Sequence, residues 1–251
     1  MINEFAMSIL EKILNWLRII FAIPKIEPNI IQEPTPVVEQ EPTVVDVVDI
    51  PQNVDQTRQE PNKEPEPDKA KEIASAAILA LRTKFGFSAN SAQANAVALL
   101  LEQCKEYEIT DKRKIAYILA TCYHECRFKS IPEIRAKKGT EVWVMQEKYW
   151  YTGYFGRGFS QLTWKSNYEK FGKLLNIDLV GHPELALIPE IGAKILVKGM
   201  ALGLFSGVGL SKYFTDTKTD WINARKIVNG TFQADKVAEA AKYIHSKIKN
   251  V

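Results

Sequence analysis

The stretch TDKRKIAYILATCYHECRF, residues 110–128, decides the fold class of this chain. Its apolar side chains recur at steps of three and four, so that Ile115, Leu119, Cys122 and Cys126 form one stripe of a helix. A stripe of this kind must be buried against other elements. The stretch therefore predicts a long helix at the centre of a packed domain.

Other stretches on both sides of this helix repeat the same spacing, with Ser, Thr or Asp available near several of their starts as caps. The predicted helices are KAKEIASAAILALRTKFG (69–86), SAQANAVALLLEQCKEY (91–107), TWKSNYEKFGKLL (163–175), PEIGAKILVKGMALGLF (189–205), TDWINARKIVNG (219–230) and ADKVAEAAKYIHSKIK (234–249). TEVWVMQEKYWYTGYF (140–155) is the one segment whose sequence allows a short hairpin. The sequence thus predicts a mainly α domain over residues 70–251.

Two segments precede this domain. Residues 1–24 carry a narrow polar stripe on an otherwise apolar helical pattern, which indicates an amphipathic helix that lies on a membrane, docks to a partner, or packs on its own domain. Residues 25–69 form an acidic linker, and nine of the twelve prolines lie between Pro24 and Asp68. Proline blocks helix formation and like charges repel, so we expect this linker to be disordered.

Charge is distributed unevenly along the chain. Residues 70–251 contain 27 Lys or Arg against 17 Asp or Glu, a net charge of +10, whereas the whole chain carries +3. A basic domain attracts polyanions, either nucleic acid or an acidic cell envelope, although a solvated surface has the same composition. Three cysteines are too few for a disulfide framework, so packing must hold the domain.

The segment CYHEC, residues 122–126, raises the question of a metal or redox site. Helix geometry places both cysteines on the buried stripe, where free cysteine is a common core residue, and the spacing lacks the C-x-x-C redox pattern. Glu125 lies at the end of the apolar helix beside His124, where a cleft would begin. A carboxyl half-buried against apolar walls gains proton affinity and suits a general acid, although a solvated Glu at a helix end is the plainer interpretation.

The segment that follows supplies a groove. In YFGRGFSQLTWKSNYEKFG, residues 154–172, glycines permit a tight backbone path beside aromatic rings such as Tyr154. Aromatic faces can stack on sugar rings, while the amide and hydroxyl groups of Gln161, Thr163 and Asn167 can bind sugar hydroxyls. The glycines lack the ending of a phosphate-binding loop.

Five ordered blocks of this chain resemble glycoside hydrolase family 19, and most closely its short phage and bacterial endolysin branch. The blocks are the HE pair ending at 125, IPE ending at 133, and the stretches 154–172, 178–187 and 223–231. The resemblance implies a lysozyme-like, two-lobed helical domain with a cleft and at most a small hairpin. It also implies a glycosidase that requires no metal or organic cofactor.

The resemblance also implies roles for individual residues. Glu125 would be the general acid and Glu133 the general base, with Glu147 as the competing base because plant members place theirs in a later loop. The substrate-binding residues would be His124, Tyr154, Gln161, Thr163, Asn167 and Asn229, of which Thr163 would position the attacking water. The family inverts the anomeric centre, which requires two carboxyls about 6.5–9.5 Å apart with a water between them.

The expected function is cleavage of β-1,4 bonds in an N-acetylglucosamine polymer, peptidoglycan in preference to chitin. We expect the enzyme to be made in the bacterial host cytoplasm and to act at the cell wall, held at a membrane or virion by residues 1–24. A chitinase and a catalytically dead wall-binding module are the alternatives. No helix-turn-helix or aromatic RNA motif is evident in the sequence, so a nucleic-acid partner is not expected.

Overall fold

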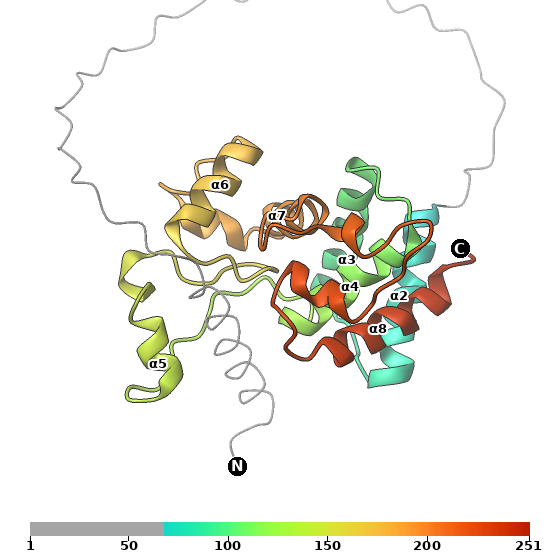
Figure 1. Cartoon of the computed structure of the whole chain (residues 1–251), viewed down its shortest axis with the longest axis horizontal. Coiled ribbons are helices and arrows are strands. Elements are labelled where there is room, and N and C mark those ends of the chain that lie inside the picture. The colour runs from blue at the N-terminus through green and yellow to red at the C-terminus, as the bar shows by residue number, and fades with distance from the viewer. Residues whose placement is uncertain (1–67) are drawn as a thin grey trace, which may run out of the picture. The chain divides into compact units, whose positions relative to one another are not determined.

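The structure, a computed structural model, describes residues 68–251 (Figure 1). In chain order its elements are α2 (Lys69–Phe85), α3 (Ser91–Glu106), α4 (Lys112–Cys126), α5 (Glu141–Gln146), η1 (Trp150–Thr152), α6 (Lys165–Leu175), η2 (Pro183–Leu187), α7 (Pro189–Leu202), η3 (Leu210–Lys212), η4 (Asn223–Ile227) and α8 (Ala234–Ile248). The predicted mainly α class is confirmed. The predicted amphipathic helix at 1–24, and the linker up to residue 67, lie outside the described residues.

Helix α4 is the centre of the larger lobe. Every residue from Ile115 to His124 is buried, as is Cys126. Helix α8 packs against α4 and α2, and α3 packs against α7. A helix that is buried on all sides needs apolar residues beyond one stripe, and α4 supplies them with small alanines as well as leucine and isoleucine. The cysteines at 122 and 126 are core residues, as predicted, with free thiols.

A second, smaller core builds the other lobe. It consists of buried side chains from the 162–195 region: Leu162, Tyr168, Phe171, Leu179, Ala186 and Ile195. Helix α7 contributes to both cores, because its Leu196, Val197 and Met200 belong to the larger one. Figure 1 shows α5 and α6 on one side, α2, α3, α4 and α8 on the other, and α7 between them. The predicted two-lobed arrangement is therefore present.

Residues 140–155, the one segment whose sequence allowed a short hairpin, form none. The segment instead forms α5 and the 3₁₀ helix η1. Thr140 caps α5 by accepting a hydrogen bond from the Trp143 amide, and Val142 and Gln146, four residues apart, are both buried. Local capping and helical burial therefore outweigh the β preference of its valines and aromatic residues. Within residues 68–251, β structure is limited to two isolated bridges, Arg157 with Leu162 and Phe214 with Thr219.

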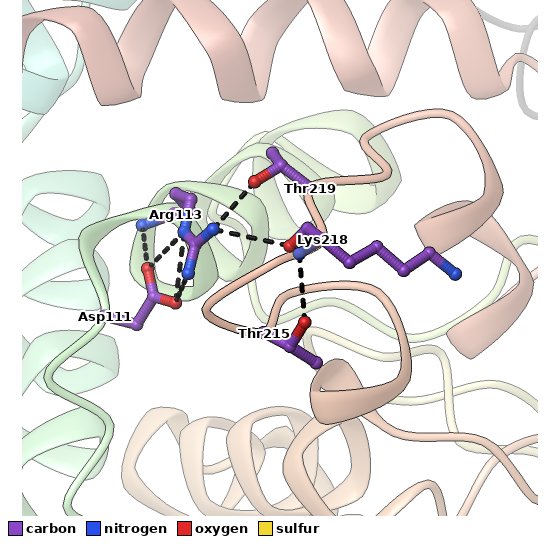
Figure 2. Close-up of polar contacts among 5 residues, drawn as sticks. All are labelled: Asp111, Arg113, Thr215, Lys218 and Thr219. Atoms are coloured by element: carbon purple, nitrogen blue, oxygen red, sulfur yellow. Dashed lines mark hydrogen bonds and ion pairs between the residues drawn. The ribbon is translucent and has the colours of Figure 1, made fainter.

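The start of α4 is tied to a distant loop (Figure 2). Asp111 caps the helix by accepting from the Arg113 amide at 2.8 Å, and its carboxylate also pairs with the Arg113 guanidinium. That guanidinium donates to Thr219 Oγ1 at 2.7 Å and to the Lys218 carbonyl at 3.4 Å. In the same loop, the Lys218 amide donates to Thr215 Oγ1. The capped end of α4 is thereby fixed opposite the end that carries Glu125.

The described part of the chain lacks both a membrane-spanning helix and a cluster of metal-ligating side chains. Among its helices, none combines the length and apolar character needed to cross a membrane. In the same residues, no three or more His, Cys, Asp or Glu side chains gather in a way that could hold a metal ion.

Candidate active site

The C-terminal end of α4 opens onto a cavity that is partly open to solvent. Five of the residues predicted from the sequence line this one cavity: Glu125, Glu133, Gln161, Thr163 and Asn229. They come from α4, from two loops of the 131–163 region and from the segment after η4. The fold thus brings together polar side chains that lie far apart in the chain, beside apolar walls such as Ile131 and Val228.

A left-handed turn directly after α4 sets the position of Glu125. Arg127 and Phe128 both have positive φ, at 54° and 58°, a conformation that costs non-glycine residues energy. The Gln93 side-chain amide stabilises the turn by donating to the Arg127 carbonyl at 2.7 Å. The chain is thereby turned sharply just beyond Glu125 and runs on to residues 131–134 of the cavity wall.

Glu125 forms an ion pair with Arg225. The distance from Arg225 Nη2 to Glu125 Oε1 is 2.6 Å, and the side chains are 1% and 10% exposed. Arg225 Nε also donates to the Phe232 carbonyl at 3.1 Å. The sequence interpretation expected apolar walls around Glu125, which favour the neutral acid, whereas the structure adds a buried cation, which favours the carboxylate.

Glu133 is held by three hydrogen-bond donors. Its Oε1 accepts from Tyr149 Oη at 2.7 Å and from Gln146 Nε2 at 2.9 Å, while its Oε2 accepts from the Gly156 amide at 3.0 Å. Burial raises the pKa of the Tyr149 phenol well above its usual range, and the neighbouring Glu133 charge raises it further. The phenol therefore stays protonated and donates to the carboxylate. No cation contributes to these three bonds, unlike at Glu125.

Gly156 and Gln161 shape the loop beside Glu133. A Cβ at Gly156 would lie 3.0 Å from Gln161 Oε1 and 3.2 Å from Glu133 Oε2, so glycine permits both side chains to approach the backbone. Gln161 Nε2 donates to the carbonyls of Ile131 and Gly158. Its amide therefore joins the two loops that line the cavity.

Thr163 and Asn229 offer polar atoms to the same cavity. Both are buried, and the Thr163 hydroxyl donates to the Gln161 carbonyl at 3.0 Å. Asn229 Oδ1 is buried without a hydrogen-bond partner within residues 68–251. Because buried polar atoms are normally paired, this oxygen is suited to accept a hydrogen bond from a ligand.

The remaining predicted site residues are placed elsewhere. His124 is buried on α4, Tyr154 donates its hydroxyl to the Val180 carbonyl, and Asn167 in the first turn of α6 donates to the Thr163 carbonyl. Glu147 forms an ion pair with Arg135. None of these four contributes to the lining of the cavity. Their predicted roles stay predictions.

Sequence reasoning did not single out Arg225, Gln146 or Tyr149 as site residues. Arg225 lies in the NARKIVNGT block, but nothing in the sequence indicates that it would be buried beside Glu125. Gln146 and Tyr149 lie in the segment whose sequence allowed a hairpin, so no helical face was predicted there. The spacing of Thr140, Val142 and Gln146 in a capped helix is the signal that could have found Gln146.

Comparison with known proteins finds one short similarity. A segment of 33 residues is 58% identical to the basic endochitinase CHB4 of Brassica napus. The similarity covers 13% of this chain and 12% of the endochitinase, so it concerns a small part of both proteins. No protein-family model matches the chain. The mainly helical, two-lobed architecture fits the lysozyme-like fold expected from the sequence.

Proposed function

We propose that this chain is an inverting glycoside hydrolase that cleaves β-1,4 bonds of an N-acetylglucosamine polymer. The observation that carries the proposal is the presence of Glu125 and Glu133 on one cavity, each supported by a different set of neighbours. An inverting glycosidase requires two carboxyl groups with different proton affinities on one substrate site. The short similarity to an endochitinase supports the same reaction class.

In this mechanism Glu133 is the general base. Its three neutral donors hold it as an oriented carboxylate next to Gln161 and Thr163, where a water could be bound. The base removes a proton from that water as its oxygen attacks the anomeric carbon. The ion pair of Glu147 with Arg135, away from the cavity lining, favours Glu133 over Glu147 for this role.

Glu125 is the general acid, and Arg225 affects how it acts. As the glycosidic bond breaks, the leaving oxygen gains charge and takes the proton from Glu125. The carboxylate that remains is stabilised by the Arg225 guanidinium at 2.6 Å.

Peptidoglycan is the proposed substrate. Residues 70–251 carry a net charge of +10, which suits an anionic wall polymer, and the ordered motifs resemble phage and bacterial endolysins. Chitin is the second candidate because the curated relative is an endochitinase. For residues 1–24 we propose attachment to a membrane or virion surface while the catalytic domain acts at the wall. Deletion of residues 1–69 should then move the protein to the soluble fraction, and unchanged fractionation would contradict attachment.

The deciding experiment is digestion of purified peptidoglycan and of chitin hexasaccharide by the full chain, with the new reducing ends identified by mass. Glu125→Gln and Glu133→Gln should each lower kcat by roughly a hundred-fold or more, since each removes a group that transfers a proton. Glu147→Gln should retain most of the activity. Early proton NMR spectra should show the α-anomer as the first product of a β-linked substrate.

Exposed Glu141 on α5 offers a matched control, because Glu141→Gln removes the same charge outside the cavity. Its activity should equal that of the wild type. If the wild-type protein binds either polymer but releases no reducing ends, the proposed hydrolase activity is contradicted. The alternative function, a catalytically dead wall-binding module, would then be supported. If kcat falls further in Glu147→Gln than in Glu133→Gln, Glu147 would replace Glu133 as the proposed general base.

A further inference from the structure

We propose that Tyr149 and Gln146 are positioning residues, and that they hold Glu133 so that its Oε2 is the oxygen that accepts the proton from the attacking water. This inference rests on the proposed function. It adds which carboxylate oxygen of Glu133 accepts the proton and which two residues determine this.

The hydrogen bonds of Glu133 divide unequally between its two oxygens. A carboxylate oxygen has about two acceptor positions. Oε1 accepts from Tyr149 Oη and Gln146 Nε2, so both of its positions are used. Among the described residues, Oε2 accepts from the Gly156 amide alone, at 3.0 Å. One acceptor position therefore remains on Oε2, and Glu133, Gly156 and Tyr149 all line the cavity.

Gln146 is fixed in one orientation. Its side chain is fully buried in the last turn of α5. Its Oε1 accepts from the Ala136 amide at 2.7 Å, and its Nε2 donates both to the Ile134 carbonyl and to Glu133 Oε1 at 2.9 Å. Rotation of the amide by 180° would set donors against the Ala136 N–H and an acceptor against the Glu133 carboxylate. Gln146 thus presents a donor, and never an acceptor, to Glu133.

Tyr149 is fixed by packing. It is 1% exposed, and its ring meets the Trp164 ring edge to face at 5.1 Å. Trp164 has φ of 75°, which is strained for a bulky residue, and its amide donates to the Tyr154 carbonyl at 2.9 Å. A strained backbone that sets a ring against Tyr149 limits the movement of the phenol. The phenol and the Gln146 amide then hold Oε1 from two sides.

The proposed step balances as follows. The water oxygen forms a bond to the anomeric carbon while one of its protons passes to Glu133 Oε2. The bond between that carbon and the glycosidic oxygen breaks, and Glu125 gives its proton to the departing oxygen. The carboxylate of Glu133 ends protonated on Oε2 and that of Glu125 ends ionised.

The test measures kcat and KM of Tyr149→Phe, Gln146→Leu and the wild-type full chain. The substrate is chitin hexasaccharide or peptidoglycan, according to which of the two the wild type cleaves. Each variant removes a donor to Oε1 and frees the carboxylate to rotate. We expect kcat to fall on the order of ten- to a hundred-fold, because small misplacements of reacting groups have effects of that size. KM should stay within about two-fold, since substrate contacts are retained. Tyr213→Phe, at a buried tyrosine outside the cavity lining, should retain the wild-type kcat.

Azide separates a missing base from a misplaced one. Azide is a nucleophile that needs no general base, because it attacks without losing a proton. In Glu133→Ala it should bind in the space that the carboxylate leaves, restore turnover and give a glycosyl azide as the product. In Tyr149→Phe the carboxylate still occupies that space, so azide should restore nothing. Unfolding curves for each variant identify any loss of activity that follows from loss of fold, and Tyr149→Phe is the smaller change if Gln146→Leu does not fold.

The outcomes are distinguishable. The positioning role would be overturned if the folded Tyr149→Phe variant kept the wild-type kcat, or if a rise in KM accounted for its whole loss of kcat/KM. Neither result would contradict the proposed hydrolase activity. Failure of the wild type to cleave either polymer would instead overturn the proposed function itself.

Discussion

The ion pair between Glu125 and Arg225 leads to a prediction about stability that can be checked without any substrate. Glu125→Gln keeps the shape of the side chain but removes the negative charge 2.6 Å from a guanidinium that is 1% exposed. Removing one member of a buried ion pair costs about 3–5 kcal/mol, and we take the lower end, about 3 kcal/mol, because the amide oxygen still accepts a hydrogen bond. For a chain of this size that corresponds to a fall in Tm of roughly 6–12 °C.

Equilibrium unfolding in urea, followed by circular dichroism, measures this change. The exposed control Glu141→Gln should stay within about 0.5 kcal/mol of the wild type. Arg225→Met should also be strongly destabilised, because Glu125 then loses its cation. The double variant Glu125→Gln/Arg225→Met should be more stable than the sum of the two single losses predicts, since removing both charges leaves neither uncompensated. A Glu125→Gln variant as stable as the wild type would refute the reasoning.

Three further predictions concern the loops and the cap of α4. Gly156→Ala should lower kcat about ten-fold or more with the fold retained, because its Cβ would lie 3.2 Å from Glu133 Oε2, and steady-state kinetics checks this. Gly158→Ala should lower Tm instead, since Gly158 has φ of 71° and a Cβ there would collide with a backbone carbonyl of η2; an unchanged melting curve would contradict this. Burial works to raise the pKa of Asp111, but the hydrogen bonds and charge of Arg113 leave it below its ordinary value of 3.8. The stability lost in Asp111→Asn should therefore be constant above about pH 4 and shrink as the pH falls further, which urea titrations at several pH values measure.

The helical lobe could be predicted from the sequence because its signals are local. The stripe through Ile115, Leu119, Cys122 and Cys126 is visible from spacing alone, and all four residues are buried as predicted. The capping residues Asp111 and Thr140 are equally local. Thr140 was nevertheless overlooked, because the valines and aromatic residues that follow it have the composition of a strand.

The electrostatics of the site could not be predicted in this way. Whether Glu125 meets an apolar wall or a cation depends on Arg225, which reaches it only after the chain has passed through the second lobe. In the same way, the amide of Gln146 finds Glu133 through the packing of α5 against residues 134–136. Contacts between distant segments depend on tertiary geometry, and a single sequence carries no local pattern for them.

The position of Arg225 in the chain has a consequence for biosynthesis. Helix α4 leaves the ribosome well before η4 does, so the pair with Glu125 cannot form until η4 has been translated. Messages that end prematurely between these two elements would yield products without the guanidinium and without α8, which packs on α4. Such fragments should be degraded rather than accumulate, because α4 would lack both the cation beside Glu125 and the packing of α8.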